Sequence, residues 1–126
     1  MTRVLVVEDS PAVRLLVSQI LEAAGYVVIP AETAADALAI VRGDPPDVAI
    51  VDEHLAETEG HALIRTLRAH PDPRVRRMIA IGMSGRAGSE QHLMAAGATC
   101  FVRKPFHGRD LLRAVRWGID VYGGAG

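Results

Sequence analysis

Three acidic residues in this chain each follow a short apolar run with the composition of a buried strand. Glu8 and Asp9 come directly after the run VLVV, and Asp52 closes the segment DVAIVD. If these carboxylates converge, each pair at about 5 Å repels by roughly 3 kcal/mol at an effective dielectric near 20. Either proton uptake or a divalent cation relieves that repulsion, and oxygen ligands with room for water suit Mg²⁺. The three acids therefore indicate a pocket suited to magnesium.

A lysine and a hydroxyl group also follow apolar runs, and they extend the chemistry that this pocket could perform. Lys104 follows the run TCFVR, and Ser84 follows MIAIGM. A metal ion, a fixed ammonium and a hydroxyl together suit a phosphoryl group. Asp52 could then act as a carboxylate nucleophile and form an acyl phosphate. Each feature alone is ordinary at a helix start or in a loop, but their joint placement favours a phosphoryl site.

The elements that must bring these residues together are parallel strands. Five short, continuous apolar runs have the pattern of strands that are covered on both faces, and helical segments separate them. The expected strands cover residues 3–8, 26–30, 47–52, 78–83 and 99–103. The expected helices begin after Ser10, after Thr33, at Gly60, after Ser89 and at Arg109. We therefore expect an α/β fold, a doubly wound five-stranded parallel sheet flanked by five helices, with its site beyond the carboxyl ends of the strands.

Two helices are expected to bury particular faces. On the first helix the predicted buried side chains are Val13, Leu16, Val17, Ile20, Leu21 and Ala24. On the last helix they are Leu111, Leu112, Val115, Ile119 and Tyr122. Trp117 and Val121 fall on the opposite side of that last helix, and residues 71–77 are expected to form a loop.

Composition limits the class of protein. The chain has 126 residues, with 14 basic and 15 acidic ones, so it gives no reason to expect nucleic-acid or membrane-surface binding. Its apolar runs are too short to cross a bilayer. The N-terminus lacks the pattern of a signal peptide, and the single Cys100 fits a reducing compartment, so we expect a cytoplasmic protein. Residues 1–122 are expected to form one domain, followed by a short flexible tail at 123–126.

Several motifs together resemble one known family. They are VLVVEDSPAVR, VAIVDEHLAETEG, Ser84-Gly85, the AAGA turn and VRKPF. Across essentially its whole length the chain resembles a response-regulator receiver domain of two-component signalling, of the single-domain chemotaxis type, which has a flavodoxin-like fold. The resemblance implies a phosphoprotein switch and not an enzyme, with at most self-phosphorylation and autodephosphorylation. The alternative is a receiver-like interaction module that signals without phosphorylation.

The resemblance also implies roles for the acidic residues. Asp52 would accept a phosphoryl group from a phosphohistidine on a sensor histidine kinase or phosphotransfer protein. Mg²⁺ would be held by Glu8, Asp9, Asp52 and the backbone carbonyl of His54. His54 and Arg86 match positions that flank the phosphoryl group and tune its hydrolysis. The five histidines are otherwise scattered, and their spacing predicts no transition-metal site.

Further roles follow for the residues near the ends of the last two strands. Lys104 would pair with the phosphoryl oxygens, Ser84 would hydrogen-bond one of them, and Phe101 would act as an aromatic switch. The Lys104–Pro105 bond is typically cis in the family. Ser84 replaces the commoner Thr, and an alternative register places Gly82 at the hydroxyl position.

The signalling partner is left open by the sequence. The exposed Trp117 suggests a homodimer or a partner contact on the last helix. The output would be either a separate protein target or an output domain of a longer protein.

Overall fold

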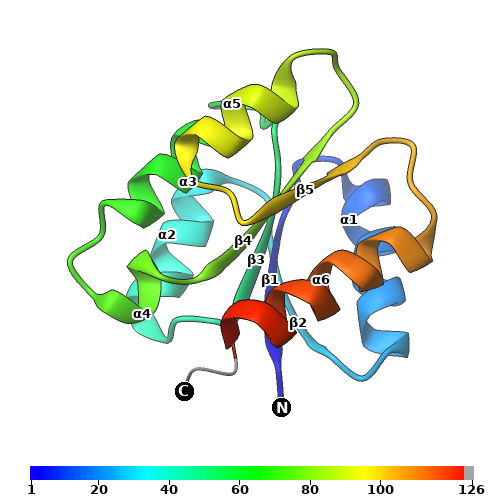
Figure 1. Cartoon of the computed structure of the whole chain (residues 1–126), viewed down its shortest axis with the longest axis horizontal. Coiled ribbons are helices and arrows are strands. Elements are labelled where there is room, and N and C mark those ends of the chain that lie inside the picture. Colours follow the sequence, from blue (N-terminus) through cyan, green and yellow to red (C-terminus); the bar gives the residue numbers. More distant parts are fainter. Residues whose placement is uncertain (124–126) are drawn as a thin grey trace.

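Five parallel strands form one sheet in the order β2-β1-β3-β4-β5 (Figure 1). The computed structural model describes residues 1–123. The strands are Arg3–Val7 (β1), Val27–Ala31 (β2), Val48–Asp52 (β3), Ile79–Ser84 (β4) and Cys100–Arg103 (β5). The strand order turns back at β1, because β2 lies on one side of it and β3 on the other. The predicted doubly wound parallel sheet is therefore confirmed.

The apolar runs of the three inner strands, β1, β3 and β4, are continuous because each of these strands faces two cores. Along β1, Leu5 and Val7 join one cluster of buried residues, whereas Val4 and Val6 join the other. One face is covered by α2 (Ala34–Gly43), α3 (Gly60–Arg68) and α5 (Ser89–Ala96), and the other by α1 (Pro11–Ala23) and α6 (Gly108–Tyr122) (Figure 1). In these inner strands, burial on both faces confines polar side chains to the strand ends, whereas the edge strands β2 and β5 are partly exposed.

The connection at residues 71–77 contains a sixth, short helix where a loop was expected. This helix, α4, spans Pro73–Arg76. The side chain of Asp72 accepts a hydrogen bond from the backbone N–H of Arg74 at 2.9 Å, and Pro73 occupies the first turn. Val75 is fully buried and anchors the turn in the core beside α3. A single turn leaves too little periodicity to be predicted from the sequence.

Two predicted helix features were wrong. Ser89 is not the cap of α5, because Gly88 takes that position with a left-handed φ of 86° and Ser89 is the first helical residue. Leu16 is 51% exposed, and Ala24 is also exposed. The buried stripe of α1 runs instead through Val17 and Ser18, whose hydroxyl donates to a backbone oxygen one turn earlier and so tolerates burial.

The end of α6 also differs from expectation. Tyr122 is 55% exposed where a buried ring was predicted. It is the last residue of α6, and its ring packs edge-on against Trp117 with centroids 5.7 Å apart. Gly123 caps the helix, and residues 124–126 of the predicted tail lie outside the described residues.

Arg68, at the end of α3, ties together the opposite edge of the sheet from the acidic residues. Its guanidinium donates to the backbone oxygens of Gly97, Arg76 and Met78 and to the hydroxyl of Thr99. Burial lowers the pKa of this guanidinium. One side chain therefore links α3, α4, the start of β4 and the turn before β5.

We expect Arg68→Met to lower the free energy of unfolding by about 2–4 kcal/mol, because several buried carbonyl groups lose a charged donor. Chemical denaturation measures this directly. Arg65→Met, an exposed position on the same helix, is the matched control and should change stability by less than about 0.5 kcal/mol. Equal effects of the two substitutions would show that the Arg68 network contributes nothing special.

Candidate functional site

An acidic pocket lies at the carboxyl edge of the sheet. Strands β1 and β3 are neighbours and parallel, with Val7 paired to Val51. Glu8 and Asp9 therefore emerge beside Asp52. One carboxylate oxygen from each of these three acids lies within 4.8 Å of the other two. The structure thus brings together the three acids that the sequence singled out.

Lys104 reaches into this pocket from the end of β5. Its Nζ lies 2.8 Å from Oδ1 of Asp52 and 3.0 Å from Oε1 of Glu8. Burial tends to lower the pKa of Lys104, but the hydrogen bonds to Asp52 and Glu8 outweigh it, so the pKa is raised. The ammonium therefore stays charged and bridges two carboxylates.

The bridge to Lys104 satisfies the carboxylate of Glu8 only in part. The residue is 1% exposed, and among the residues that the structure describes none hydrogen-bonds its Oε2. Burial, and next the charge of Asp52, raise the pKa of Glu8 to about 7. A buried carboxylate oxygen without a partner, beside two more carboxylates, fits a hard divalent cation such as Mg²⁺.

The loop after Asp52 is held close to the backbone of that residue. Gly60 begins α3, and a Cβ atom there would lie only 2.2 Å from the backbone oxygen of Asp52. The N–H of Gly60 donates to the backbone oxygen of Glu53 at 2.7 Å. Glu57 accepts a hydrogen bond at 2.6 Å from the backbone N–H of Ala34, the first residue of α2. These contacts fix the edge of the pocket, and neither Gly60 nor Glu57 had been assigned to the site from the sequence.

His54 lies in this loop. Its backbone forms an isolated antiparallel bridge with Glu59. Its ring atom Nε2 is buried and has no hydrogen-bond partner in the part of the chain that the structure describes. The bridge positions the backbone of His54 two residues beyond Asp52.

Ser84 is the last residue of β4 and is 1% exposed. Its hydroxyl contacts the backbone N–H and carbonyl of Arg86, each at 3.3 Å, and its own backbone oxygen accepts from the N–H of Lys104 at 2.7 Å. Gly82, the alternative, lies inside the sheet opposite Val51, and a Cβ there would meet the side chain of Leu93 at 2.6 Å. Ser84 therefore adjoins the lysine, whereas Gly82 faces α5. The side chain of Arg86 is exposed.

Two aromatic residues of interest lie outside the acidic pocket. Phe101, on β5, is 37% exposed, and Trp117, on α6, is 46% exposed. The Lys104–Pro105 peptide bond between β5 and α6 is cis, as the resemblance implied. Within residues 1–123, no helix has the length and apolar character needed to cross a membrane.

Comparison with curated proteins gives relatives that are regulators. The chain is 33% identical to the transcriptional regulatory protein CseB of Streptomyces coelicolor, over 99% of this chain and 52% of the relative. It is 36% identical to the transcriptional regulatory protein KdpE of Mycobacterium tuberculosis, over 92% of this chain and 50% of the relative. The chain thus spans about half the length of both relatives.

Solved structures of response regulators match this chain over nearly its full length and theirs. A CheY-like response regulator receiver domain protein from Methanospirillum hungatei superposes with a TM-score of 0.90 and 30% identity, covering 100% of this chain and 99% of that one. The chemotaxis protein CheY4 of Vibrio cholerae superposes with a TM-score of 0.85 and 28% identity, covering 93% and 98%.

The family described as the response regulator receiver domain matches residues 4–116. This match covers β1 from its second residue, the other four strands and most of α6, including the acidic pocket and its lysine. This chain belongs to the response regulator receiver domain family of two-component systems.

Proposed function

We propose that this chain is a Mg²⁺-dependent phosphoacceptor, in which Asp52 receives a phosphoryl group from a phosphohistidine on a sensor histidine kinase or phosphotransfer protein. The observation that carries the proposal is the Lys104 ammonium bridging Asp52 and Glu8, beside the Oε2 of Glu8, which has no hydrogen-bond partner within residues 1–123. A site built only for stability would satisfy that buried oxygen. Here a free oxygen and a fixed cation flank a buried aspartate.

The chemistry proposed for Asp52 is an in-line transfer. A carboxylate oxygen of Asp52 attacks phosphorus, a P–O bond forms as the P–N bond breaks, and the donor imidazole leaves with the electron pair. Lys104 then pairs with an oxygen of the transferred group, and the Ser84 hydroxyl turns from Arg86 to donate to another.

The metal would be held by Glu8, Asp9, Asp52 and the backbone carbonyl of His54. When bound, Mg²⁺ supplies positive charge that offsets the repulsion between phosphoryl oxygens and the acids. Lys104 and Mg²⁺ together would balance the three carboxylates.

The proposed output is a population shift between two surface conformations. Movement of Ser84 toward the phosphoryl group would open space next to β5, and Phe101, which is partly exposed here, would turn inward. His54 and Arg86 are proposed to adjust how long the phosphoryl group lasts, by shielding it or ordering water.

The proposed partners act through α6. Trp117 and Val121 are 46% and 53% exposed on this helix, and we assign them to a homodimer contact or to a target protein. One structural neighbour is a probable two-component system response regulator/GGDEF domain protein. An output domain elsewhere in a longer protein is the other proposed route.

The first test is phosphorylation itself. Incubation with acetyl phosphate and Mg²⁺ should add one phosphoryl group to the intact protein, seen by mass spectrometry, because Asp52 is the nucleophile. Asp52→Asn should remove the gain, and Asp44→Asn, an exposed acid at the other edge, should keep it. A protein that stays unmodified would favour the non-phosphorylated interaction module instead.

The second test uses the raised pKa of Glu8. The pKa in the folded protein (about 7) exceeds the ordinary value of 4.5, so the metal-free protein should lose stability as the pH rises from about 5 to about 7. In Glu8→Gln this loss of stability should be smaller by roughly 1–3 kcal/mol. Denaturation at about pH 5 and at about pH 7 measures the difference. Adding Mg²⁺ at about pH 8 should raise the free energy of unfolding of the wild-type protein, and should raise that of the variant much less. Parallel pH profiles for the two proteins would contradict this.

The third test concerns Trp117. With a phosphoryl mimic bound, wild type should sediment faster than Trp117→Ala, because the substitution removes the largest apolar group of the proposed contact. Arg113→Ala, an exposed position one turn earlier, is the control. Monomeric behaviour of wild type under both conditions would rule out the homodimer and leave a target protein as the partner.

A further inference from the structure

We propose a second metal site, for a zinc-class divalent transition-metal ion, between the N-terminus of α3 and α5. The ligands are Nε2 of His61, the carboxylate of Glu59 and the ring of His92, and Glu53 orients His61 from behind. The site shares no residue with the acidic pocket of Glu8, Asp9 and Asp52.

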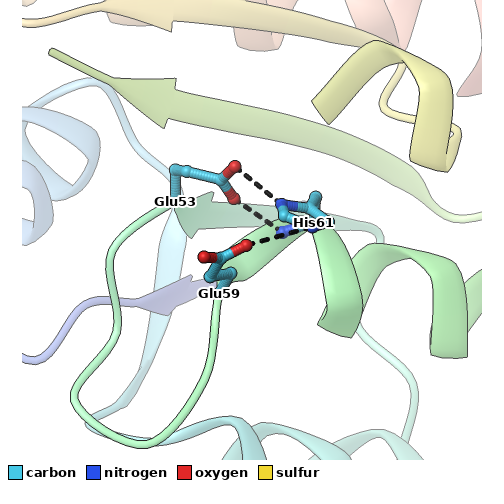
Figure 2. A group of neighbouring side chains, drawn as sticks. All are labelled: Glu53, Glu59 and His61. Atoms are coloured by element: carbon cyan, nitrogen blue, oxygen red, sulfur yellow. Dashed lines mark hydrogen bonds and ion pairs between the residues drawn. The ribbon is translucent and has the colours of Figure 1, made fainter. Parts of the chain in front are cut away.

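The centre of the proposed site is the ring of His61, which lies between two carboxylates (Figure 2). Its Nδ1 lies 2.7 Å from Oε2 of Glu53, and its Nε2 lies 3.2 Å from Oε2 of Glu59. One ligand atom from each of Glu53, Glu59 and His61 lies within 4.8 Å of the other two. An imidazole between two carboxylates is the arrangement of a histidine ligand with its supporting acid.

Glu53 has the properties of that supporting acid. It is 2% exposed, and its other oxygen accepts the backbone N–H of His61 at 2.8 Å. A bond to Nδ1 fixes the tautomer of the ring and leaves Nε2 for a metal. The second carboxylate is placed differently: Glu59 is largely exposed, with 64% of its side chain accessible, so it can adjust to an ion.

The separation between Glu59 and Nε2 matches ligands of one ion. Zinc bonds of about 2.0–2.1 Å to nitrogen and oxygen place two tetrahedral ligands about 3.3 Å apart. The observed 3.2 Å is close to that value.

His92 supplies the third ligand from another element. Its ring stacks on His61 with centroids 5.1 Å apart and planes inclined by 23°. His92 is exposed on α5, and a rotation of its ring away from the stack would turn a nitrogen toward the ion. Imidazole ligands favour Zn²⁺, Ni²⁺ or Co²⁺ over Mg²⁺, which distinguishes this site from the all-oxygen pocket. Water would complete the coordination.

The location gives the site a role. Glu59 belongs to the loop that follows Asp52, and α5 follows the segment after Ser84. A metal joining Glu59 and His61 to His92 would brace both segments that border the acidic pocket. Occupancy would therefore couple metal availability to the region proposed to move.

Cobalt(II) titration of the full chain tests the proposal, with excess Mg²⁺ present to occupy the acidic pocket. One equivalent of Co²⁺ should give the visible absorption of a low-coordinate histidine site, and Zn²⁺ should abolish it. Glu59→Gln and His92→Ala, both at exposed positions, should each weaken binding by about tenfold or more. Gln91→Ala, the exposed neighbour of His92, should bind as wild type does.

Circular dichroism of each metal-free variant checks that it is folded. A loss of cobalt binding in a folded variant can then be attributed to the loss of a metal ligand. Wild-type affinity in either Glu59→Gln or His92→Ala overturns the proposed ligand set. Absence of the cobalt absorption in the wild-type protein overturns the site, because no ion would then be bound by histidine. Loss of the absorption in Asp9→Asn but not in Glu59→Gln also overturns it, because the ion would then lie in the acidic pocket.

Discussion

The bridge from Lys104 to Asp52 and Glu8 is the interaction on which the rest of the site depends. Three carboxylates at one edge of a buried sheet would repel one another, and a single ammonium at 2.8 and 3.0 Å offsets only part of that repulsion. Burial, and next the remaining repulsion from Asp52, raise the pKa of Glu8, and its Oε2 has no hydrogen-bond partner among the residues that the structure describes. An imbalance of this kind makes the pocket receptive to a cation and then to a phosphoryl group, whose charge Lys104 and the cation can share.

The fold supplies the constraint that keeps the charges together. Strands buried on both faces end at the same edge, and the polar residues that follow them have no other place to go. Close backbone approaches hold that edge. Gly60 lies where a Cβ atom would collide with the backbone of Asp52, and the backbone N–H of Lys104 donates to Ser84. The acids cannot relax apart without disturbing the two cores.

The sequence was sufficient for the sheet and for the convergence of Glu8, Asp9, Asp52 and Lys104, because apolar runs ending in polar residues determine both. It was insufficient for contacts that depend on side-chain directions. The turn of α4, the exposure of Leu16 and the packing of Tyr122 on Trp117 are decided by small rotations of helices against the sheet. The group of Glu53, Glu59 and His61 was also missed. Its members come from a loop and a helix start, their spacing follows no metal motif, and His92 lies about thirty residues further along the chain.

The titration of the Glu8 carboxyl, followed by carbon NMR with and without Mg²⁺, tests the central claim most directly. We expect a pKa of about 7 for Glu8 without metal, and a clear decrease when Mg²⁺ is added, since the ion favours the charged form. A Glu8 carboxyl that titrates near 4.5 and does not respond to Mg²⁺ would show that the acids at this edge are neither strained nor built to hold a cation.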